Sequence, residues 1–263
     1  MKKTKGKINT REVSKYLLPV CSIVVLLLVW TLYSLQNSDV LPTPYRVCEK
    51  MLDLIEHPIA QTTITGHILA SLKRVFIGLA FAMVIGIPFG MAIGWNRLFR
   101  AVFQPVFEII RPIPPLAWVP LITIWCGIFE TSKIILVFIG TFMAIVVNTY
   151  AGVTLASKDN IAVARMFGVK GVRLLTDIVF PSAIPSVMAG LKTALTTGWG
   201  VVLAAEMISA DSGLGFLVTR GSDSNDIELV LVAIILIGLI GALMSAVFTI
   251  IERKLSPWRT DIN

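Results

Sequence analysis

Residues 75–95 read VFIGLAFAMVIGIPFGMAIGW, an uninterrupted run without a single charged side chain. A helix of about 20 apolar residues crosses roughly 30 Å of hydrocarbon, so this stretch predicts a transmembrane helix. Small residues recur within it at every fourth position, at Gly78, Ala82, Gly86, Gly90 and Gly94. Because helices in a membrane approach closely where their side chains are small, this ridge predicts a compact helix bundle.

The composition of the whole chain supports the same class. Of its 263 residues, 56% are hydrophobic and 15% charged, against about 45–50% and 25% in soluble domains, and the mean hydropathy is +0.82. A water-soluble globule could not bury that much apolar surface. Cys21, Cys48 and Cys126 match no metal or disulfide spacing. We therefore predict an all-α, polytopic membrane protein without a metal site.

Six apolar stretches have the length of a membrane span: residues 17–35, 75–95, 101–128, 134–153, 184–208 and 229–251. The third contains Glu108 and Arg111, so we expect its apolar part to start near Ile113, and prolines at 112, 114 and 115 predict an irregular start. The first could instead be a cleaved signal peptide. Its nineteen apolar residues exceed the usual 7–15 and no A-x-A-like site follows, which favours a retained span.

The distribution of lysine and arginine predicts the orientation. Six spans place sixteen of the twenty-three cations on the side that holds both termini, and the positive-inside rule makes that side the cytoplasm. Since the cations avoid the apolar runs and collect in loops, they indicate membrane topology rather than nucleic-acid binding. The expected organisation is a cytoplasmic basic N-terminus (1–16), a first transmembrane helix (17–35), an extracytoplasmic loop (36–66), a core of five transmembrane helices (67–255) and a cytoplasmic tail (256–263).

The extracytoplasmic loop is expected to contain a short amphipathic helix. Thr43 can cap it and Pro44 suits its first position. Pro58 would end the run, and the apolar face comprises Val47, Met51, Leu54 and Ile55.

The loop over residues 154–183 is too polar to cross a bilayer, and its regular pattern of apolar residues argues against an unstructured segment. Asp159 or Asn160 can cap a helix, Gly168 and Gly171 interrupt the apolar pattern, and Pro181 and Pro185 are expected to close it. We predict two short helices joined by a glycine turn. Their small side chains would let another protein approach, so the pair suits a docking element, rimmed by Arg165, Lys170 and Arg173.

This loop resembles the EAA loop of the permeases of ABC importers. That pattern runs Glu-Ala-Ala, three residues, Gly, nine residues, then Ile-x-Leu-Pro. Here Ala162 stands in place of the Glu, Val163 in place of the first Ala and Phe180 in place of the Leu, whereas the matching residues are Ala164, Gly168, Ile178 and Pro181. The resemblance implies that an ATPase contacts this segment, at Ala162, Val163, Ala164, Arg165, Gly168, Ile178 and Pro181. The missing Glu removes any ion pair that it would make there.

Four further stretches are similar to the nitrate/sulfonate/taurine-type permeases. They are RPIPPLAWVP (111–120), NTYAG (148–152), AEM with SGLG (205–207 and 212–215) and LPTP (41–44). Together the motifs cover roughly residues 40–255. The resemblance implies a type I importer fold with cytoplasmic coupling helices, located in a prokaryotic inner membrane.

It also implies partners: a second permease copy, usually in a homodimer, two cytoplasmic ATPase subunits and an extracytoplasmic substrate-binding protein. This chain has no Gly-x-x-x-x-Gly-Lys-Ser/Thr loop, so ATP and magnesium would be bound by the ATPases, and we expect neither a cofactor nor enzymatic activity here. The solute would be small and anionic, and alternating access would carry it across.

Polar residues within the spans are candidates for the translocation path. Lys192 and Thr196 share a face of the fifth span, beside Thr197, and a lysine in a membrane should face protein or a water-filled cavity. Lys192 could equally snorkel to the cytoplasmic surface. Glu206 could pair with an outer-loop residue such as Arg220 or contact the delivery protein. Arg111 could be a gating hinge or a topology anchor.

The sequence supports three other functional classes less well. An ion-coupled secondary carrier usually places carboxylates near the membrane midplane, whereas Glu206 is the only acid well inside a clean span and lies near its end. A membrane enzyme would need a catalytic cluster, and His57 and His67 stand alone. A purely structural membrane protein would not need the ordered loop over residues 154–183.

Overall fold

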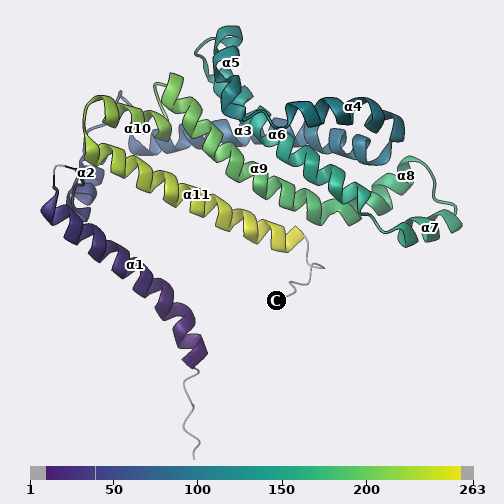
Figure 1. Ribbon diagram of the computed structural model, residues 1–263, viewed down its shortest axis with the longest axis horizontal. Coiled ribbons are helices and arrows are strands. Elements are labelled where there is room, and N and C mark those ends of the chain that lie inside the picture. Colours follow the sequence, from purple (N-terminus) through teal and green to yellow (C-terminus); the bar gives the residue numbers. More distant parts are fainter. Residues whose placement is uncertain (1–9, 39, 256–263) are drawn as a thin grey trace, which may run out of the picture.

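The computed structural model describes residues 10–38 and 40–255, which are helical almost throughout and form no β-sheet (Figure 1). The predicted all-α class is therefore confirmed. In chain order the helices are α1 (Thr10–Gln36), α2 (Pro44–Glu56), α3 (Ile64–Trp95), α4 (Arg97–Ile110), the 3-10 helix η1 (Pro115–Trp118), α5 (Val119–Cys126), α6 (Glu130–Thr154), α7 (Lys158–Met166), α8 (Val172–Leu174), the π-helix η2 (Leu175–Val179), α9 (Phe180–Ser209), α10 (Leu214–Asp223) and α11 (Ile227–Leu255).

Four helical stretches in the described residues are long and apolar enough to cross a membrane: α3, α6, α11 and the continuous stretch Val172–Ser209. A fifth span results if α4 and the η1–α5 segment count as one, although they are bent by 86°. The apolar part of α1, Val20–Gln36, is shorter. The count of six spans therefore stays a prediction, and residues 1–9 and 256–263 of the predicted cytoplasmic ends lie outside the described residues.

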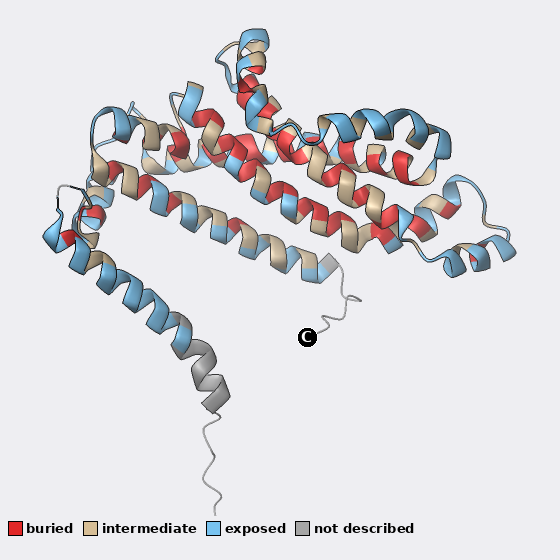
Figure 2. Cartoon of the chain, viewed as in Figure 1, coloured by how far each residue is buried: buried red, intermediate tan, exposed pale blue. Residues whose placement is uncertain are grey.

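Helix α6 lies between α3 and α9 at the centre of the molecule, and buried residues line both seams (Figure 2). The glycine ridge of α3 forms the first seam: a Cβ at Gly78 would collide with Val137, and one at Gly90 with Thr149. Gly190 and Gly198 of α9 approach α6 equally closely, where an added Cβ would collide with Asn148 and Thr141. The predicted compact bundle is thus confirmed, and the glycines of both α3 and α9 pack against α6.

Helix α3 begins eleven residues before the predicted apolar span, because Thr63 accepts a hydrogen bond from the backbone N–H of Gly66 and caps a helix that starts at Ile64. The extra turns bring Arg74 into the buried part of the helix. Arg74 thus belongs to the helix although it precedes the predicted apolar span 75–95. Its charge is tolerated there because it is paired with carboxylates, as described below.

The third predicted span is not a single helix. Helix α4 ends at Ile110, and the chain then turns sharply into η1 and α5. The prolines at 112, 114 and 115 explain the break, since a proline lacks the N–H that continues a helix and clashes with the preceding turn. The predicted irregular start is thus confirmed, but it lies between two helices.

Helix α2 begins at Pro44 and is capped by Thr43, as predicted. Its apolar face is only half buried: Val47 and Leu54 lie in the core, whereas Met51 and Ile55 are exposed. Helix α1 extends away from the bundle (Figure 1) and is joined to it through α2, with Trp30 Nε1 donating to the carbonyl of Pro42 at 3.0 Å.

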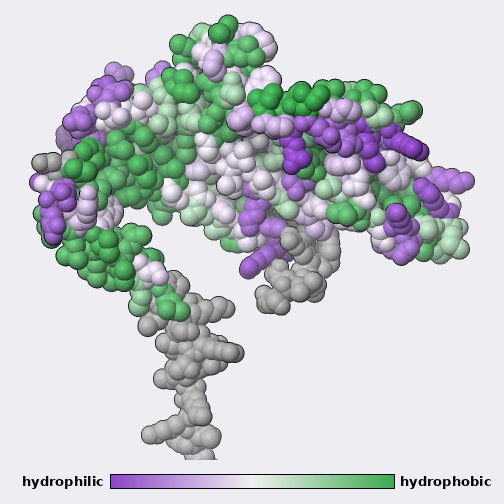
Figure 3. Space-filling model, viewed as in Figure 1, coloured by the Kyte–Doolittle hydropathy of each residue, from purple (hydrophilic) through white to green (hydrophobic). Residues whose placement is uncertain are grey.

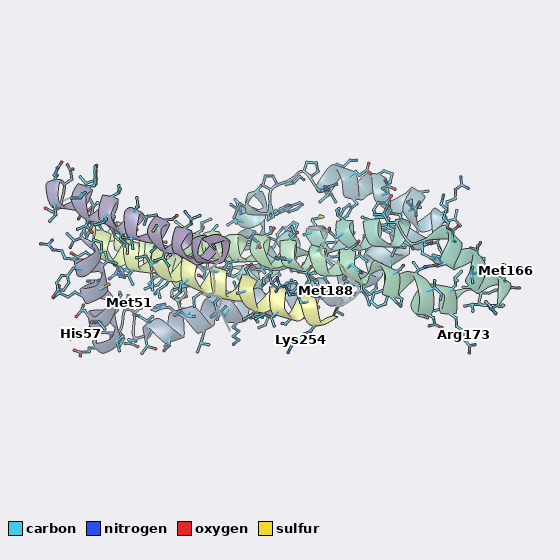
Figure 4. The ribbon with its side chains drawn as sticks, turned by 90° about the horizontal axis from the view of Figure 1, so that it is seen from below. Met51, His57, Met166, Arg173, Met188 and Lys254 are labelled. Atoms are coloured by element: carbon cyan, nitrogen blue, oxygen red, sulfur yellow. The ribbon has the colours of Figure 1, made fainter. Side chains whose placement is uncertain are left out.

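On the face shown in Figure 3, hydrophilic residues of the elongated molecule gather at the end that holds α2 and α10 and, in a broader band, over the half that holds α4, α7 and α8. One end, which we call the α10 end, holds α2 and α10, and the other, the α7 end, holds α7 and α8 (Figure 1). Figure 4 shows Met51 and His57 at the first and Met166 and Arg173 at the second. Helices α3, α6, α9 and α11 run between these ends.

Candidate functional site

The loop at the α7 end consists of a short helix, a glycine turn and a helix that merges with α9. Ser157 caps α7 by accepting a hydrogen bond from the backbone N–H of Asn160 at 3.3 Å, so the cap lies two residues before the predicted Asp159. Gly168 and Gly171 have φ values of +81° and +61°, which favour glycine. The first short helix and the glycine turn are therefore confirmed.

The second helix of the loop does not end at the prolines. It passes through a π-turn at Leu175–Val179 directly into α9. Pro181 lies where the π-turn meets α9, and Pro185 lies inside the helix. The prediction that prolines separate loop from span is thus wrong, and a displacement of this loop would act directly on α9.

The loop is held to the bundle by a few small contacts. Ala164 and Leu174 are buried, and Val179 packs with Val153 and Ala183 at the adjoining ends of α6 and α9. Its outward side carries exposed apolar side chains instead: Met166 is 86% and Phe167 83% exposed. An apolar patch at the end of a membrane bundle, with basic residues around it, is typical of a protein–protein contact.

The predicted contact residues divide between these two sides. Ala162, Val163, Arg165 and Gly168 are exposed, whereas Ala164 is buried and Ile178 and Pro181 are partly buried. The sequence interpretation did not single out Met166 and Phe167. Two large apolar residues directly before a turn glycine were the signal for them.

A cavity of about 300 Å³ lies beside α6, between the end of α4 and the middle of α9. Arg111, Trp118, Asn148, Thr193 and Thr197 contribute to its lining. A second cavity of about 160 Å³ shares Arg111 and is lined further toward the α7 end by Tyr150. The two cavities share Arg111 and Val147 and follow α6, and each carries a few polar groups on a mostly apolar lining.

Of the predicted path residues, Thr197 lines the larger cavity, and Thr196 and Lys192 do not. The hydroxyl of Thr196 donates to the carbonyl of Lys192 at 3.2 Å. The ammonium of Lys192 donates to Thr249 Oγ1 at 3.2 Å and lies 3.9 Å from Glu252 Oε2. Lys192 therefore connects α9 to α11.

A buried ion cluster holds the α10 end together. Arg74 on α3 is 2% exposed, and its Nη1 donates to Glu206 Oε1 on α9 at 2.6 Å and to the carbonyl of Ser212 at 2.7 Å. Its Nη2 and Nε donate to the two oxygens of Glu130 on α6 at 2.6 and 2.7 Å. One guanidinium thus links three spans, and the partner of Glu206 is Arg74 rather than Arg220.

The remaining groups of the cluster complete its charge balance. Lys133 Nζ donates to Glu130 at 3.1 Å, so two cations face two carboxylates. The second oxygen of Glu206 accepts from Ser71 Oγ and from the backbone N–H of Gly215, each at 2.9 Å. A side chain at Gly213 would collide with the Glu206 carboxylate, which explains why this loop is glycine-rich.

No group of three or more His, Cys, Asp or Glu side chains within residues 10–38 and 40–255 has the arrangement of a metal site. The features on these residues are long apolar helices, a cavity beside them with several polar groups in its lining and an exposed apolar surface at one end. These features define the membrane subunit of a transporter.

Comparison with known proteins gives the family. Residues 82–257 match the family described as the binding-protein-dependent transport system inner membrane component. The chain is 35% identical to the taurine transport system permease protein TauC of Escherichia coli, over 93% of this chain and 90% of that protein. It is 32% identical to the nitrate import permease protein NrtB of a Synechocystis species, over 92% and 90%. It is 30% identical to the bicarbonate transport system permease protein CmpB of Synechococcus elongatus, over 90% and 88%.

Solved structures agree on the fold. The MetNI methionine ABC transporter in an inward-facing conformation matches 71% of this chain and 93% of its own, with a TM-score of 0.63 and 20% identity. The chain belongs to the family of binding-protein-dependent inner-membrane permeases. It is a permease subunit of an ABC importer and not itself an enzyme, because the ATPase activity of this family resides in separate subunits.

Proposed function

We propose that this chain forms the translocation path of an importer for a small oxyanion such as a sulfonate, nitrate or bicarbonate. The names of three relatives support this substrate class, since they are permeases for taurine, nitrate and bicarbonate. The polar cavity beside α6 supports a route for a small solute. ATP and magnesium would be bound by the partner ATPases.

The observation that carries the coupling proposal is the exposed apolar surface of the α7 end. Met166 and Phe167 project from a loop whose other face is anchored by Ala164 and Leu174. In our proposal an ATPase subunit covers this surface, with Ala162, Val163, Arg165 and Gly168 at the contact. Because the loop merges with α9 through the π-turn, closure of the ATPases would move α6 and α9 as rigid elements.

The α7 end would face the cytoplasm together with both termini, as the distribution of lysine and arginine predicts. The α10 end, with α2, would then face the delivery protein on the outer side. A second copy of the chain would complete the path, since the cavity beside α6 is lined by one chain on only part of its circumference. Glu206 would serve the path indirectly, by fixing α9 to α3 at the outer end.

The test is the substitution Gly168→Asp in the assembled importer. An added Cβ at this position meets nothing within 4 Å in this chain, and Asp tolerates a positive φ better than most residues, so the permease itself should fold. We expect the variant to insert into the membrane but to lose ATP-driven uptake, because bulk and negative charge would obstruct the ATPase. Gly168→Asn is the matched neutral control.

Copurification and uptake in proteoliposomes give separate readouts. Reduced copurification of the ATPase with Gly168→Asp, and a smaller reduction with Gly168→Asn, would support the proposed contact. Normal uptake by Gly168→Asp would refute it. Uptake by the wild-type permease in liposomes without ATPase would instead favour an ion-coupled carrier.

A further inference from the structure

The larger cavity lies near the middle of the predicted spans. Gly140, which lines it, is about 15 Å from the start of α6 and about 21 Å from its end at 1.5 Å per residue. Thr197 is about 25 and 18 Å from the two ends of α9 by the same rise. Sites near the membrane midplane that are formed at a broken helix are typical of transported solutes, and the break after α4 lies beside this cavity.

Arg111 stands at that break and is the only charged residue that lines this cavity in the described part of the chain. It follows the last residue of α4, and its backbone N–H donates to the carbonyl of Phe107 at 2.9 Å. Its side chain is exposed, and within residues 10–38 and 40–255 no carboxylate lies within 4 Å of it. A guanidinium at mid-membrane depth is costly unless it faces water or an anion.

The cavity offers hydrogen-bonding groups around this cation. Asn148 and Thr193 face it from α6 and α9, and their side chains also donate to the carbonyls of Ala144 and Ala189. Thr197 adds a hydroxyl. At about 30 Å³ of liquid volume per water, about 300 Å³ can hold a small oxyanion with part of its hydration shell.

Arg111 also lines the second cavity, so it stands where the two cavities meet. Glu108 lies in that second cavity, where its carboxylate accepts a hydrogen bond from Gln104 at 2.7 Å. An anion that moved from the first cavity into the second would reach the guanidinium of Arg111 before the carboxylate of Glu108. Because the guanidinium comes before the carboxylate on this path, Arg111 is suited to bind the solute in the middle of the membrane.

We infer that Arg111 is the anion-binding residue of the translocation cavity, where its planar guanidinium holds two oxygens of a small oxyanion. This inference rests on the proposed function for its substrate class. It assigns the charge recognition to the broken helix α4 rather than to Lys192 of α9. A bidentate geometry makes lysine an incomplete replacement, because an ammonium is a point charge.

The first test measures the charge selectivity of the cavity without transport. Cys21, Cys48 and Cys126 are replaced by serine in the assembled importer, and Thr197→Cys is introduced as a reporter. Its reaction rates are compared for an anionic thiol reagent, sulfonatoethyl methanethiosulfonate, and a cationic one, trimethylammonioethyl methanethiosulfonate. We expect the ratio of anionic to cationic rates to fall roughly tenfold on Arg111→Gln, because a unit charge acts on the reagent over a few ångströms.

Arg97→Gln is the matched control. It removes the same charge from the other end of α4, about 20 Å from Arg111 at 1.5 Å per residue, which is beyond the Debye length of about 8 Å at physiological salt. Its ratio should stay within twofold of the parent. An unchanged ratio in Arg111→Gln, or a Thr197→Cys that reacts with neither reagent, would overturn the inference.

The second test measures uptake by the importer with its ATPases and binding protein, with taurine, nitrate and bicarbonate as probes. Arg111→Lys should raise the concentration for half-maximal uptake roughly tenfold and keep the charge selectivity of the first test. Arg111→Gln should lose both the uptake and the charge selectivity. If Arg111→Gln takes up the probes as well as the wild type does, the inference about Arg111 is refuted, whereas the proposed function is not. Absence of ATP-dependent uptake of all three probes by the wild type would reject the proposed substrate class, while the thiol ratio would still decide whether the cavity selects anions.

Discussion

At the α10 end, one buried guanidinium joins α3, α6 and α9 through four hydrogen bonds to Glu130, Glu206 and the carbonyl of Ser212. At the α7 end, Val179 packs with Val153 and Ala183 at the ends of α6 and α9, and Ala164 and Leu174 are the buried apolar side chains of the loop itself. Ion pairs of this kind are directional, and apolar contacts are not. The first end therefore fixes the relative positions of three spans, whereas the second can be displaced by a partner without leaving a charge unpaired.

The largest effect should follow from Arg74→Gln, because this variant removes the guanidinium that joins the three helices at the α10 end. Removing one partner of a buried ion cluster leaves the other charges uncompensated, at a cost of about 3–5 kcal/mol. Glu206 would lose its cation in a site where it is 1% exposed. We expect a large loss of thermal stability of the purified permease in detergent.

Glu130→Gln provides the control for that experiment. Its side chain is 58% exposed, so water can replace part of the lost interaction, and the destabilisation should be clearly smaller than for Arg74→Gln. Equal stability of Arg74→Gln and the wild type would show that the cluster does not hold the α10 end.

The sequence predicted the parts of this comparison that depend on local pattern. The four-residue spacing from Gly78 to Gly94 predicts a helix ridge, and positive-φ turns at Gly168 and Gly171 follow from glycine between two apolar runs. Local pattern does not decide the cap of α7, because Ser157, Asp159 and Asn160 are all able to cap and only the tertiary structure selects one.

Contacts between distant parts of the chain could not be predicted from local pattern. Arg74 and Glu206 are separated by 132 positions in the sequence, and a lone arginine beside an apolar run is read as a loop residue until its counter-charge is known. The cavity likewise depends on where α4 breaks, since that break places Arg111 in the lining of the cavity that Thr197 also lines. The proline cluster predicts the break but not its angle.

An intermediate effect should follow from Leu174→Ala at the α7 end. Leu174 is 2% exposed, and truncating a buried leucine costs about 2–5 kcal/mol, with the lower figure expected where the surroundings can collapse. A short loop can collapse in this way, so we expect about 2 kcal/mol, measured by the same thermal unfolding in detergent. The effect should be smaller than that of Arg74→Gln.

Phe167→Ala is the matched variant on the opposite face of the same loop. Because Phe167 is 83% exposed, its loss should change stability by no more than about 0.5 kcal/mol while weakening association with the ATPase. A large destabilisation by Phe167→Ala in the isolated permease would indicate that this surface packs within the chain and is not kept for a partner.

The smallest effect concerns an ion pair at the α10 end that is partly open to water. Lys50 on α2 lies 2.8 Å from Asp226 before α11, and their side chains are 24% and 29% exposed. The hydrogen bond to Asp226 raises the pKa of Lys50. Burial alone would raise the pKa of Asp226, but hydrogen bonds from Lys50 and the backbone N–H of Leu229 outweigh it and lower this pKa below its ordinary value.

These two shifts define the pH range in which the pair stabilises the fold. The lowered pKa of Asp226 gives a contribution that is present above the ordinary pKa of an aspartate and is lost as the pH falls through the folded value. The raised pKa of Lys50 gives a contribution that is present below the ordinary pKa of a lysine and is lost as the pH rises through the folded value. Asp226→Asn should therefore cost no more than about 1 kcal/mol near neutral pH and nothing below the folded pKa of Asp226. Thermal unfolding of both proteins across an acid pH series would check this, and a difference that persists undiminished at the acid limit would show that the charge of Asp226 is not what stabilises the fold.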